Sequence, residues 1–344
     1  MARIVLADDG IAFDGTTPAT QPLGGVESAV CALVAALAVR GHQVFVRNKC
    51  DRRLVHDGVD WAPIDDGLPA TADLYIANRG DKLLPLMPDA GRTVFWIHNP
   101  ARYLLKWRYL SKLWRLNPAV VFIGDYHATT YPRWAPAGER VIIPYGIGDA
   151  FLGEDKPRDP PPPRAIFTSN PLRSLDWLLD VWSRRIRPRV PTAELHLFAG
   201  AATYGAVGEA KAAAMEAVLG DARRRADDGV VLRSPLPKSA LAGELRAARV
   251  MLYRGDVNET FCLAVGEAQA MGVPAVVEDL GSVGERVIDG ETGRVAPDEE
   301  AFAEAAVALL ADDELWRRQH GNALARQRSW GWPDAAASFE RLIP

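Results

Sequence analysis

The sequence predicts an α/β protein built from two doubly wound, Rossmann-like domains that face a cleft, and three observations support this fold class. Short apolar runs alternate with longer helical stretches, which is typical of parallel sheets with crossover helices. The alternation occurs twice, and four consecutive prolines at 160–163 separate the two series. The 344 residues are enough for two domains of ordinary size.

The first series contains six strand candidates and one strong helix candidate. The expected strands are 3–7, 43–46, 73–78, 93–97, 120–124 and 140–144. Their β-branched and aromatic residues favour strands. Residues 25–40 carry apolar side chains at helical spacing and end at the stop signal "RGH". The first domain is expected to span 1–152.

A proline-rich linker is expected at 153–165, because consecutive prolines cannot continue a helix or a central strand and favour a stiff spacer. The second series follows it as a domain over 166–328. Its strand candidates are 164–169, 194–200, 229–234, 249–255, 274–278 and 293–297, and its helix candidates are 174–187, 207–226, 238–248, 261–272 and 301–327. Ligands of such sheets bind beyond the carboxyl ends of the strands, so the cleft between the domains is the expected site.

Composition and charge exclude several classes of protein. The chain is 48% hydrophobic and 24% charged with a net charge of -4, so a nucleic-acid partner is not expected. Its three cysteines lie far apart without a CxxC pair, which argues against a disulfide framework and a structural zinc site. The N-terminus lacks the layout of a signal peptide, and no apolar stretch approaches the ~18 residues of a membrane span. We therefore expect a cytoplasmic protein.

Two predicted helix starts are suited to bind an anion. Gly24 and Gly25 open the first helix, where glycines let a ligand approach free backbone N–H groups. The alternative is a flexible loop that ends in a helix-starting glycine pair. The second helix start lies between Glu259 and Glu267, and its first turn would offer unpaired N–H groups. These groups belong to Thr260, Phe261, Cys262 and Leu263. The alternative here is an N-cap acid followed by a structural helix glutamate.

The string "ETFCLAVGEAQAMGVPAVV", with "GSVGERVIDGETGRVAPD" after it, closely resembles the donor-binding region of retaining glycosyltransferases of family 4, which have the GT-B fold. The likeness extends along the chain. "PLGGVESAVCALVAALAVRGHQVFV" is similar to the family's first glycine loop and helix, "WIHNP" to the end of its fourth strand, and "RVIIPYGIGDAF" to its interdomain crossover. "SWGWPDAAASFERLI" is similar to its last helix, which implies that 329–344 returns to the first domain.

The resemblance implies a role for each matching residue. Glu259 and Glu267 match the family's Glu-x7-Glu motif, which implies that Glu259 binds sugar hydroxyls together with the neighbouring backbone N–H groups and that Glu267 binds the ribose. Gly25 would offer its N–H to the donor phosphate, and His98 would face the transferred sugar or the acceptor. The alternative for His98, which follows an apolar strand, is a structural role.

A cationic clamp is also expected, because negative charge develops on the leaving diphosphate. The family supplies an arginine and a lysine from the first βα turn of the second domain. That turn reads "FTSNPLRSLDWLLDVW" here, with Arg173 in place of the usual lysine and Ser169 and Asn170 in place of a second basic residue. Arg173 is therefore the main clamp candidate, and its fork can bind a diphosphate in bidentate fashion. Tyr145 also departs from the family, which commonly has asparagine in "PYG".

These roles imply a retaining, metal-independent glycosyltransferase that moves a sugar from a nucleotide-diphosphate sugar to an acceptor hydroxyl. No cofactor is expected beyond this donor substrate, and the acceptor would be a glycan, a lipid-linked molecule or a small molecule. No strand ends in a D-x-D motif, and the acidic pairs at 8–9, 65–66 and 312–313 are interpreted as turns and solvated surface. The alternatives are a nucleotide-sugar epimerase of the same fold and a sugar-binding protein without catalysis.

Residues 101–116 form an unusual basic and aromatic segment. Helical spacing places Arg108, Lys112 and Arg115 on one face, and Tyr103, Trp107, Leu110 and Trp114 on another. One interpretation is an ordinary amphipathic helix that packs on the sheet with a solvated basic face. The alternatives are a weak peripheral contact with the inner membrane face and a platform for a sugar or an anionic acceptor.

Overall fold

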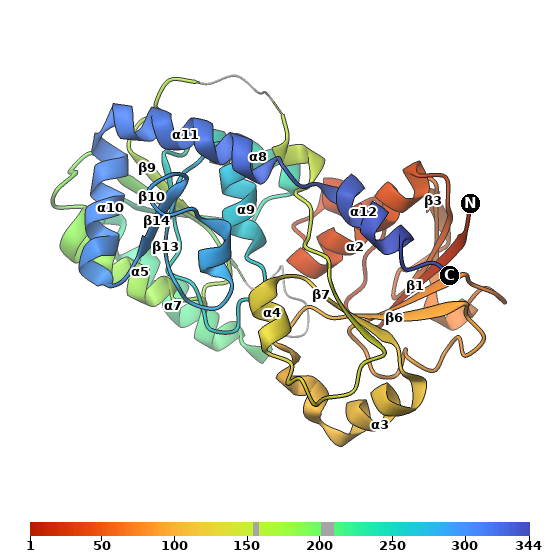
Figure 1. Cartoon of the computed structure of the whole chain (residues 1–344). Coiled ribbons are helices and arrows are strands. Elements are labelled where there is room, and N and C mark those ends of the chain that lie inside the picture. Colours follow the sequence, from red (N-terminus) through yellow and green to blue (C-terminus); the bar gives the residue numbers. More distant parts are fainter. Residues whose placement is uncertain (154–157, 201–209) are drawn as a thin grey trace. The chain divides into compact units, whose positions relative to one another are not determined.

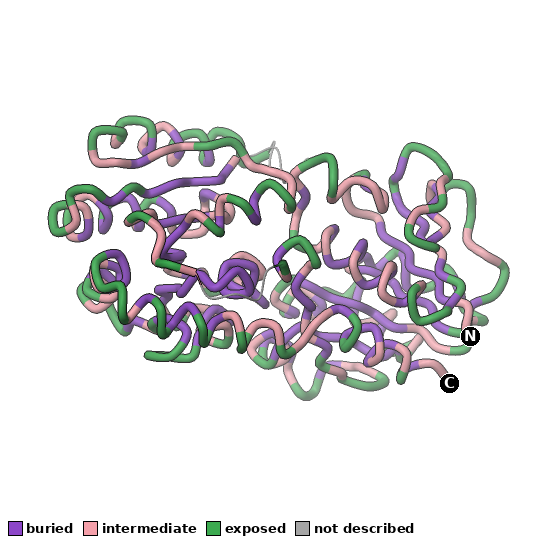
Figure 2. The backbone as a smooth tube through the Cα atoms, turned by 90° about the horizontal axis from the view of Figure 1, so that it is seen from above, coloured by how far each residue is buried: buried purple, intermediate pink, exposed green. Residues whose placement is uncertain are grey.

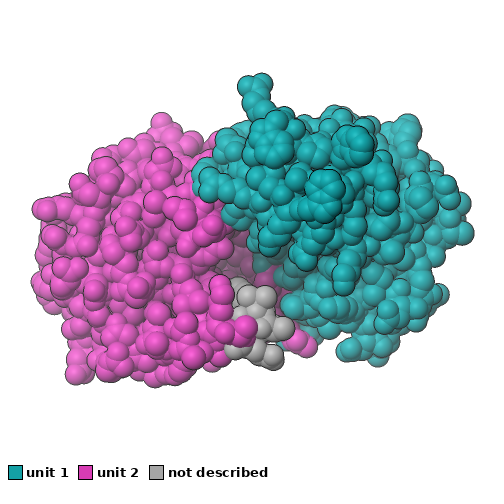
Figure 3. Space-filling view, turned by 90° about the horizontal axis from the view of Figure 1, so that it is seen from below, with its two compact units in different colours: residues 1–20, 25–146, 330–344 teal, residues 21–24, 147–329 magenta. Residues whose placement is uncertain are grey.

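The computed structural model describes residues 1–153, 158–200 and 210–344, which form two compact units (Figures 1 and 3). The first unit comprises 1–20, 25–146 and 330–344, and the second comprises 21–24 and 147–329. The first unit thus ends at Gly146 rather than at residue 152. The described part of the expected linker, residues 153 and 158–165, belongs to the second unit, and its last two residues lie in a strand.

The first unit contains an eight-stranded sheet in the order β3-β4-β2-β1-β5-β6-β7-β8. Its strands are β1 (Arg3–Asp8), β2 (Gln43–Asn48), β3 (Leu54–His56), β4 (Val59–Pro63), β5 (Leu74–Asn78), β6 (Arg92–Trp96), β7 (Ala119–Phe122) and β8 (Glu139–Ile142). β3 pairs antiparallel with β4, and the other neighbours are parallel. The six strands expected in this half are confirmed. The hairpin of β3 and β4 was missed, because charged residues interrupt its apolar pattern.

Neighbouring residues of β6 show how this sheet is covered on both faces. Side chains alternate along a strand, and the ring of Phe95 packs on Tyr109 with centroids 6.4 Å apart, whereas the ring of Trp96 packs on Phe339 at 5.3 Å. Tyr109 lies in α3 (Trp107–Leu116), and Phe339 lies in α12 (Trp332–Glu340), which also packs against α2 (Gly25–Val39). α3 therefore covers one face, and α2 with α12 covers the other. The shorter helices are α1 (Thr17–Thr20) and α4 (Asp125–Thr129).

The second unit contains a parallel six-stranded sheet in the order β11-β10-β9-β12-β13-β14. Its strands are β9 (Arg164–Phe167), β10 (Glu194–Phe198), β11 (Val230–Arg233), β12 (Val250–Leu252), β13 (Ala275–Glu278) and β14 (Gly293–Ala296), and all six were expected. The strand order reverses between β9 and β12, as it does between β1 and β5 in the first unit. Such a reversal opens a crevice at the carboxyl ends of the strands, where ligands of doubly wound sheets bind.

The helices of the second unit differ from expectation in their ends. They are α5 (Leu175–Val181), which continues as the π-helical η4 (Trp182–Ile186), α7 (Ala212–Arg224), α8 (Lys238–Arg246), α9 (Leu263–Ala270), α10 (Glu299–Ala311) and α11 (Asp313–Gln327). The single helix expected at 301–327 is two, because the Asp312 carboxylate caps α11 by accepting from the N–H groups of Glu314 at 2.9 Å and Leu315 at 3.0 Å. The first residues of the helix expected at 207–226 lie outside the described residues.

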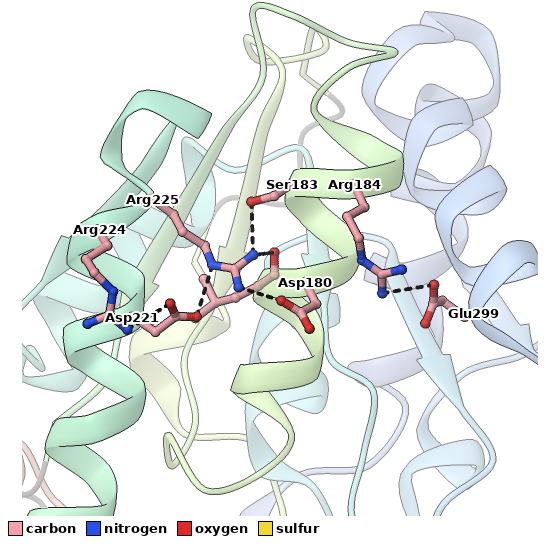
Figure 4. A network of polar contacts seen from close by, with 8 residues as sticks. Asp180, Ser183, Arg184, Asp221, Arg224, Arg225 and Glu299 are labelled. Atoms are coloured by element: carbon pink, nitrogen blue, oxygen red, sulfur yellow. Dashed lines mark hydrogen bonds and ion pairs between the residues drawn. The ribbon is translucent and has the colours of Figure 1, made fainter.

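Arg225 joins α7 to α5 and η4 (Figure 4). Its guanidinium donates to Asp180 at 2.5 Å, to Asp221 at 3.0 Å and to the Ser183 hydroxyl at 3.2 Å. Arg184 of η4 forms a longer ion pair with Glu299 at 3.5 Å. Exposed pairs such as the last contribute little to stability. The unit is stabilised mainly by the buried core beneath these helices, and buried residues are purple in Figure 2. No helix within the described part of the chain is long and apolar enough to cross a bilayer.

Candidate functional site

The candidate site of the second unit contains the loop that leads from β12 into α9. Cys262 is the N-cap residue of α9, in the left-handed region with φ 60° and ψ 66°. A helix cannot continue backwards through that conformation, so α9 begins at Leu263, two residues later than expected. Thr260, Phe261 and Cys262 precede the helix instead of forming its first turn. A non-glycine residue held in this region is strained, and such strain concentrates at ligand sites.

Glu259 lies in this loop and is held by two donors. Its Oε2 accepts a hydrogen bond from the Tyr253 hydroxyl at 2.8 Å and another from Arg173 Nη1 at 3.1 Å. Burial raises the pKa of Tyr253 well above its ordinary value, so its hydroxyl stays protonated and donates. Arg173 also lies 3.4 Å from Asp256. The residue predicted to clamp the diphosphate and the residue predicted to bind the sugar thus form one ion pair.

Arg173 remains charged in this setting. Burial lowers its pKa, but the nearby carboxylates of Glu259 and Asp256 outweigh that effect and raise the pKa overall. Two carboxylates therefore hold the guanidinium in place. A diphosphate would compete with them for its N–H groups.

Glu267 is buried on α9 and has a cationic partner that sequence reasoning missed. Its Oε1 lies 2.5 Å from the Nζ of Lys238, the first residue of α8. The second cation was expected only in the first βα turn of this half. The order of elements nevertheless indicates Lys238, since α8 follows the third strand of the unit and the starts of such helices lie at the carboxyl edge of the sheet.

Lys238 lines a pocket at this edge that holds about 430 Å³ of empty space, its open mouth included. The pocket wall is formed by Pro22, Leu23, Thr168, Ser169, Phe198, Ala199, Gly200, Pro235, Leu236, Lys238 and Leu241. Ser169 lies in this wall, and its contact with a donor stays a prediction. The Oδ1 of Asn170 accepts from the N–H of Leu172 at 2.9 Å and so shapes the turn, and the donor contact of Asn170 also stays a prediction.

The glycine pair lies where the chain passes from one unit to the other. Gly24 belongs to the second unit, directly after two residues of the pocket wall, and Gly25 is the first residue of α2 in the first unit. The helix start expected at this pair is confirmed. The phosphate contact of Gly25 stays a prediction.

The first unit has a buried polar network where its strand order reverses. Asp8, at the end of β1, accepts from Asn78 Nδ2 at 2.5 Å and from Arg79 Nε at 2.9 Å. Arg79 also pairs with Glu27 in the first turn of α2, at 2.9 Å. Asp8 is fully buried. The interpretation of the acidic pair at 8–9 as a turn and solvated surface is therefore wrong for Asp8. Its partner Arg79 directly follows β5 and is far from it in sequence.

His98 extends this network, and its neighbours fix its tautomer. Asn78 donates to Asp8 through Nδ2, so its Oδ1 is the acceptor for His98 Nε2–H at 2.5 Å. Burial, Arg79 and His127 hold the pKa of His98 well below its ordinary value. The neutral ring then accepts at Nδ1 from the Tyr145 hydroxyl, 2.5 Å away. Tyr145, noted above as a departure from the family, thus orients His98. A catalytic contact of His98 stays a prediction.

Acidification is expected to destabilise the protein through its buried histidines. Burial lowers the pKa of His127 to about 4, and that of His98 is also depressed. An unfolded histidine binds a proton below pH ~6.5 whereas these two do not, so the free energy of unfolding falls as pH drops below that value, by up to about 1.4 kcal/mol per pH unit for each. Urea unfolding between pH 7 and 5 measures the slope. His56, whose side chain is 39% exposed, is the control when changed to Gln, and this variant should preserve the slope. A flat profile would contradict buried neutral histidines.

Residues 163–312 match the family model of the group 1 glycosyl transferases. The D-inositol 3-phosphate glycosyltransferase of Xylanimonas cellulosilytica is 37% identical over 114 residues, which is 33% of this chain and 27% of that protein. The phosphatidyl-myo-inositol mannosyltransferase of Mycobacterium leprae is 33% identical over 103 residues, 29% of this chain and 28% of that protein. The chain thus matches about a quarter of the length of these curated relatives.

Solved structures match over nearly the full chain. Sucrose-phosphate synthase from Thermosynechococcus elongatus has a TM-score of 0.77 at 19% identity and covers 99% of this chain and 98% of its own. Anabaena HepE in complex with UDP and glucose has a TM-score of 0.72 at 15% identity, with the same coverage. At such low identity, the likeness to these structures establishes the fold alone. The family model supports the expected resemblance to glycosyltransferases at the level of group 1. The chain therefore has the GT-B fold, and residues 163–312 of its second unit are similar to the group 1 glycosyl transferases.

Proposed function

We propose that this protein is a retaining, metal-independent glycosyltransferase that moves a sugar from a nucleotide-diphosphate sugar to an acceptor hydroxyl. The observation that carries the proposal is the pair of carboxylate–cation contacts on either side of the start of α9. Glu259 pairs with Arg173, and Glu267 pairs with Lys238. The arrangement offers carboxylates for sugar and ribose hydroxyls and two cations for a diphosphate.

The roles follow from chemistry at the leaving group. Departure of the nucleoside diphosphate places negative charge on its β-phosphate, which Arg173 can bind with two parallel N–H groups. Lys238 supplies the second positive charge that the first βα turn lacks. Glu267 accepts hydrogen bonds from the ribose diol, and Glu259 orients the sugar. Retention without an enzymic nucleophile is attributed to same-face substitution, in which a phosphate oxygen takes the proton of the acceptor hydroxyl.

The acceptor is proposed to be a glycan, a lipid-linked molecule or a small molecule that carries a free hydroxyl. One relative is named for an inositol phosphate and another for a phosphatidyl-inositol. Proteins with similar sequences are thus named for both a soluble and a lipid-linked acceptor. We place the activity in the cytoplasm, with a peripheral position at the membrane as an additional proposal.

Donor turnover is expected to survive chelation. Arg173 and Lys238 can neutralise the diphosphate without a divalent ion, because both are fixed cations at the candidate site. The assay follows hydrolysis or transfer from labelled nucleotide sugar, with and without excess EDTA. Loss of turnover that manganese or magnesium restores would overturn the metal-free proposal.

A ligand screen separates this proposal from its alternatives. Nucleoside diphosphates of each base are tested by thermal shift, since a ligand at about 100 times its dissociation constant adds about 2.7 kcal/mol of stability. The stabilising donor is then supplied with labelled sugar. Release or transfer of the sugar supports a transferase, recovery of an epimeric nucleotide sugar indicates the epimerase, and binding without turnover indicates a sugar-binding protein.

A further inference from the structure

Two tryptophans of α3 project into solvent. Trp107 and Trp114 are each 80% exposed, and their spacing of seven residues places them on one side of the helix. The opposite side is buried through Tyr109 and Leu113, which belong to the core beneath the sheet. Tyr109 and Leu113 therefore pack the helix on the sheet. This packing does not explain why two tryptophans occupy the exposed side.

The structure alters the expected basic and aromatic faces of this segment at two residues, Tyr103 and Lys112. Residues Ala101–Leu105 form a 3₁₀ turn, and α3 begins at Trp107. Lys112 turns inward, where its Nζ donates to Asp81 at 2.7 Å. Arg108 and Arg115 are exposed about 100° around the helix from Trp107 and Trp114, and Arg108 also lies 3.6 Å from Asp81. Aromatic and cationic side chains thus occupy adjoining exposed faces of α3.

The charge of this region is opposite to that of the whole chain. Five basic residues and no acidic residue occur between 101 and 117, in a protein of net charge -4. Four of the five are exposed, namely Arg102, Lys106, Arg108 and Arg115. Asp81 pairs with Lys112 and Arg108 and offsets part of this charge, but the field around the tryptophans stays positive because Arg102, Lys106 and Arg115 remain.

A third exposed tryptophan lies on the same side of the sheet. Trp134 is 71% exposed and follows the exposed Arg133. Its flanking residues Tyr131 and Ala135 belong to the same buried cluster as Tyr109 of α3. The loop at 131–135 and α3, the gold helix labelled in Figure 1, therefore cover the same face of the sheet.

We propose that the outward face of α3 with Trp134 is a docking surface for an anionic lipid bilayer. This α3 surface consists of Lys106, Trp107, Arg108, Trp114, Arg115 and Trp134. Tryptophan rings partition into the headgroup region, and arginine and lysine are attracted to anionic lipids. A ten-residue helix is about 15 Å long, so it lies along the interface and does not span it. The inference does not depend on the proposed transferase activity.

Vesicle flotation with the full chain tests this surface. The probes are vesicles of pure phosphatidylcholine and vesicles in which roughly a third of the lipid is anionic phosphatidylglycerol. Both are tested at low and at high salt. Wild-type protein is expected to bind the anionic vesicles, to bind the neutral ones at least about tenfold more weakly, and to be released by salt. Each basic residue near an anionic surface contributes roughly a fivefold increase in affinity, so Lys106→Gln with Arg115→Gln should lower it by about 25-fold.

The variant Trp107→Ser with Trp114→Ser tests the aromatic contribution, and Val55→Ser is the matched control because Val55 is 73% exposed on β3 of the same unit. The tryptophan variant should lose anionic binding while its melting temperature and its nucleoside diphosphate affinity stay those of the wild type. The control should bind as the wild type does. Equal binding to both vesicle types, absence of binding to either, or unchanged binding by the tryptophan variant would each overturn the proposal. Self-association through α3 without vesicle binding would assign the surface to a second copy instead.

Discussion

Glu267→Ala is expected to weaken the binding of both free nucleoside diphosphate and intact nucleotide sugar by tenfold or more. Both ligands carry the ribose, and a charge-assisted hydrogen bond of the kind proposed for Glu267 is worth ~1.5–3 kcal/mol. The loss also leaves the Lys238 ammonium without the carboxylate that lies 2.5 Å away. Calorimetry with the diphosphate and with the donor measures both affinities.

Lys238→Ala, alone and combined with Glu267→Ala, separates two roles for the lysine. If Lys238 only positions Glu267, the double variant should bind no more weakly than Glu267→Ala. If Lys238 also meets the phosphates, the double variant should lose further affinity for the diphosphate but none for the nucleoside. Glu244→Ala is a matched control on the same unit, because Glu244 also pairs with a cation, Arg164, at 3.1 Å. Equal diphosphate affinity for folded Glu267→Ala and the wild type would refute the ribose assignment.

The strands of both sheets were predictable because each is short, apolar and bounded by polar residues. Val120 and Val121, for example, are completely buried and belong to an uninterrupted apolar run. Parallel strands buried on both faces produce such runs. β4 lacks this signal, since Asp60 interrupts it and pairs with Arg47 at 2.7 Å. A charged residue with a distant partner cannot be distinguished from a turn residue in the sequence alone.

The same limit explains what was missed at the candidate site. Lys238 meets Glu267 across 29 positions of sequence, and Asp8 meets Arg79 across 71. These contacts depend on which strand ends the topology brings together. The order of elements places Lys238 at the carboxyl edge of the sheet, but it does not show which residue at that edge is its partner. The start of α9 was predicted two residues too early for a local reason. Cys262 adopts a left-handed conformation that is usually occupied by glycine, so its sequence does not indicate a helix boundary there. The resemblance to the family predicted that Glu259, Glu267 and Arg173 are site residues. Their contacts with one another and with Lys238 became visible only in the structure.

Glu259→Ala is expected to lower turnover by about a hundredfold while it leaves diphosphate affinity nearly unchanged. The proposed partner of Glu259 is the transferred sugar, which free diphosphate lacks, and loss of an orienting contact of this kind costs roughly 10²-fold in rate. The arginine clamp should persist in the variant, because Asp256 still lies 3.4 Å from Arg173. Steady-state kinetics with the donor and calorimetry with the diphosphate measure the two effects.

The ion pair of Glu259 and Arg173 makes this variant informative about stability as well. If Glu259 serves only to hold the loop, its removal leaves the Tyr253 hydroxyl and Arg173 without a shared acceptor, and the melting temperature should fall with no selective effect on ligands. Glu259→Gln retains an acceptor for both donors but removes the charge. It should therefore recover the melting temperature and still turn over slowly, because a neutral amide binds sugar hydroxyls more weakly than a carboxylate does. Wild-type turnover in folded Glu259→Gln, or a loss of diphosphate affinity equal to that of Glu267→Ala, would contradict the sugar-binding role.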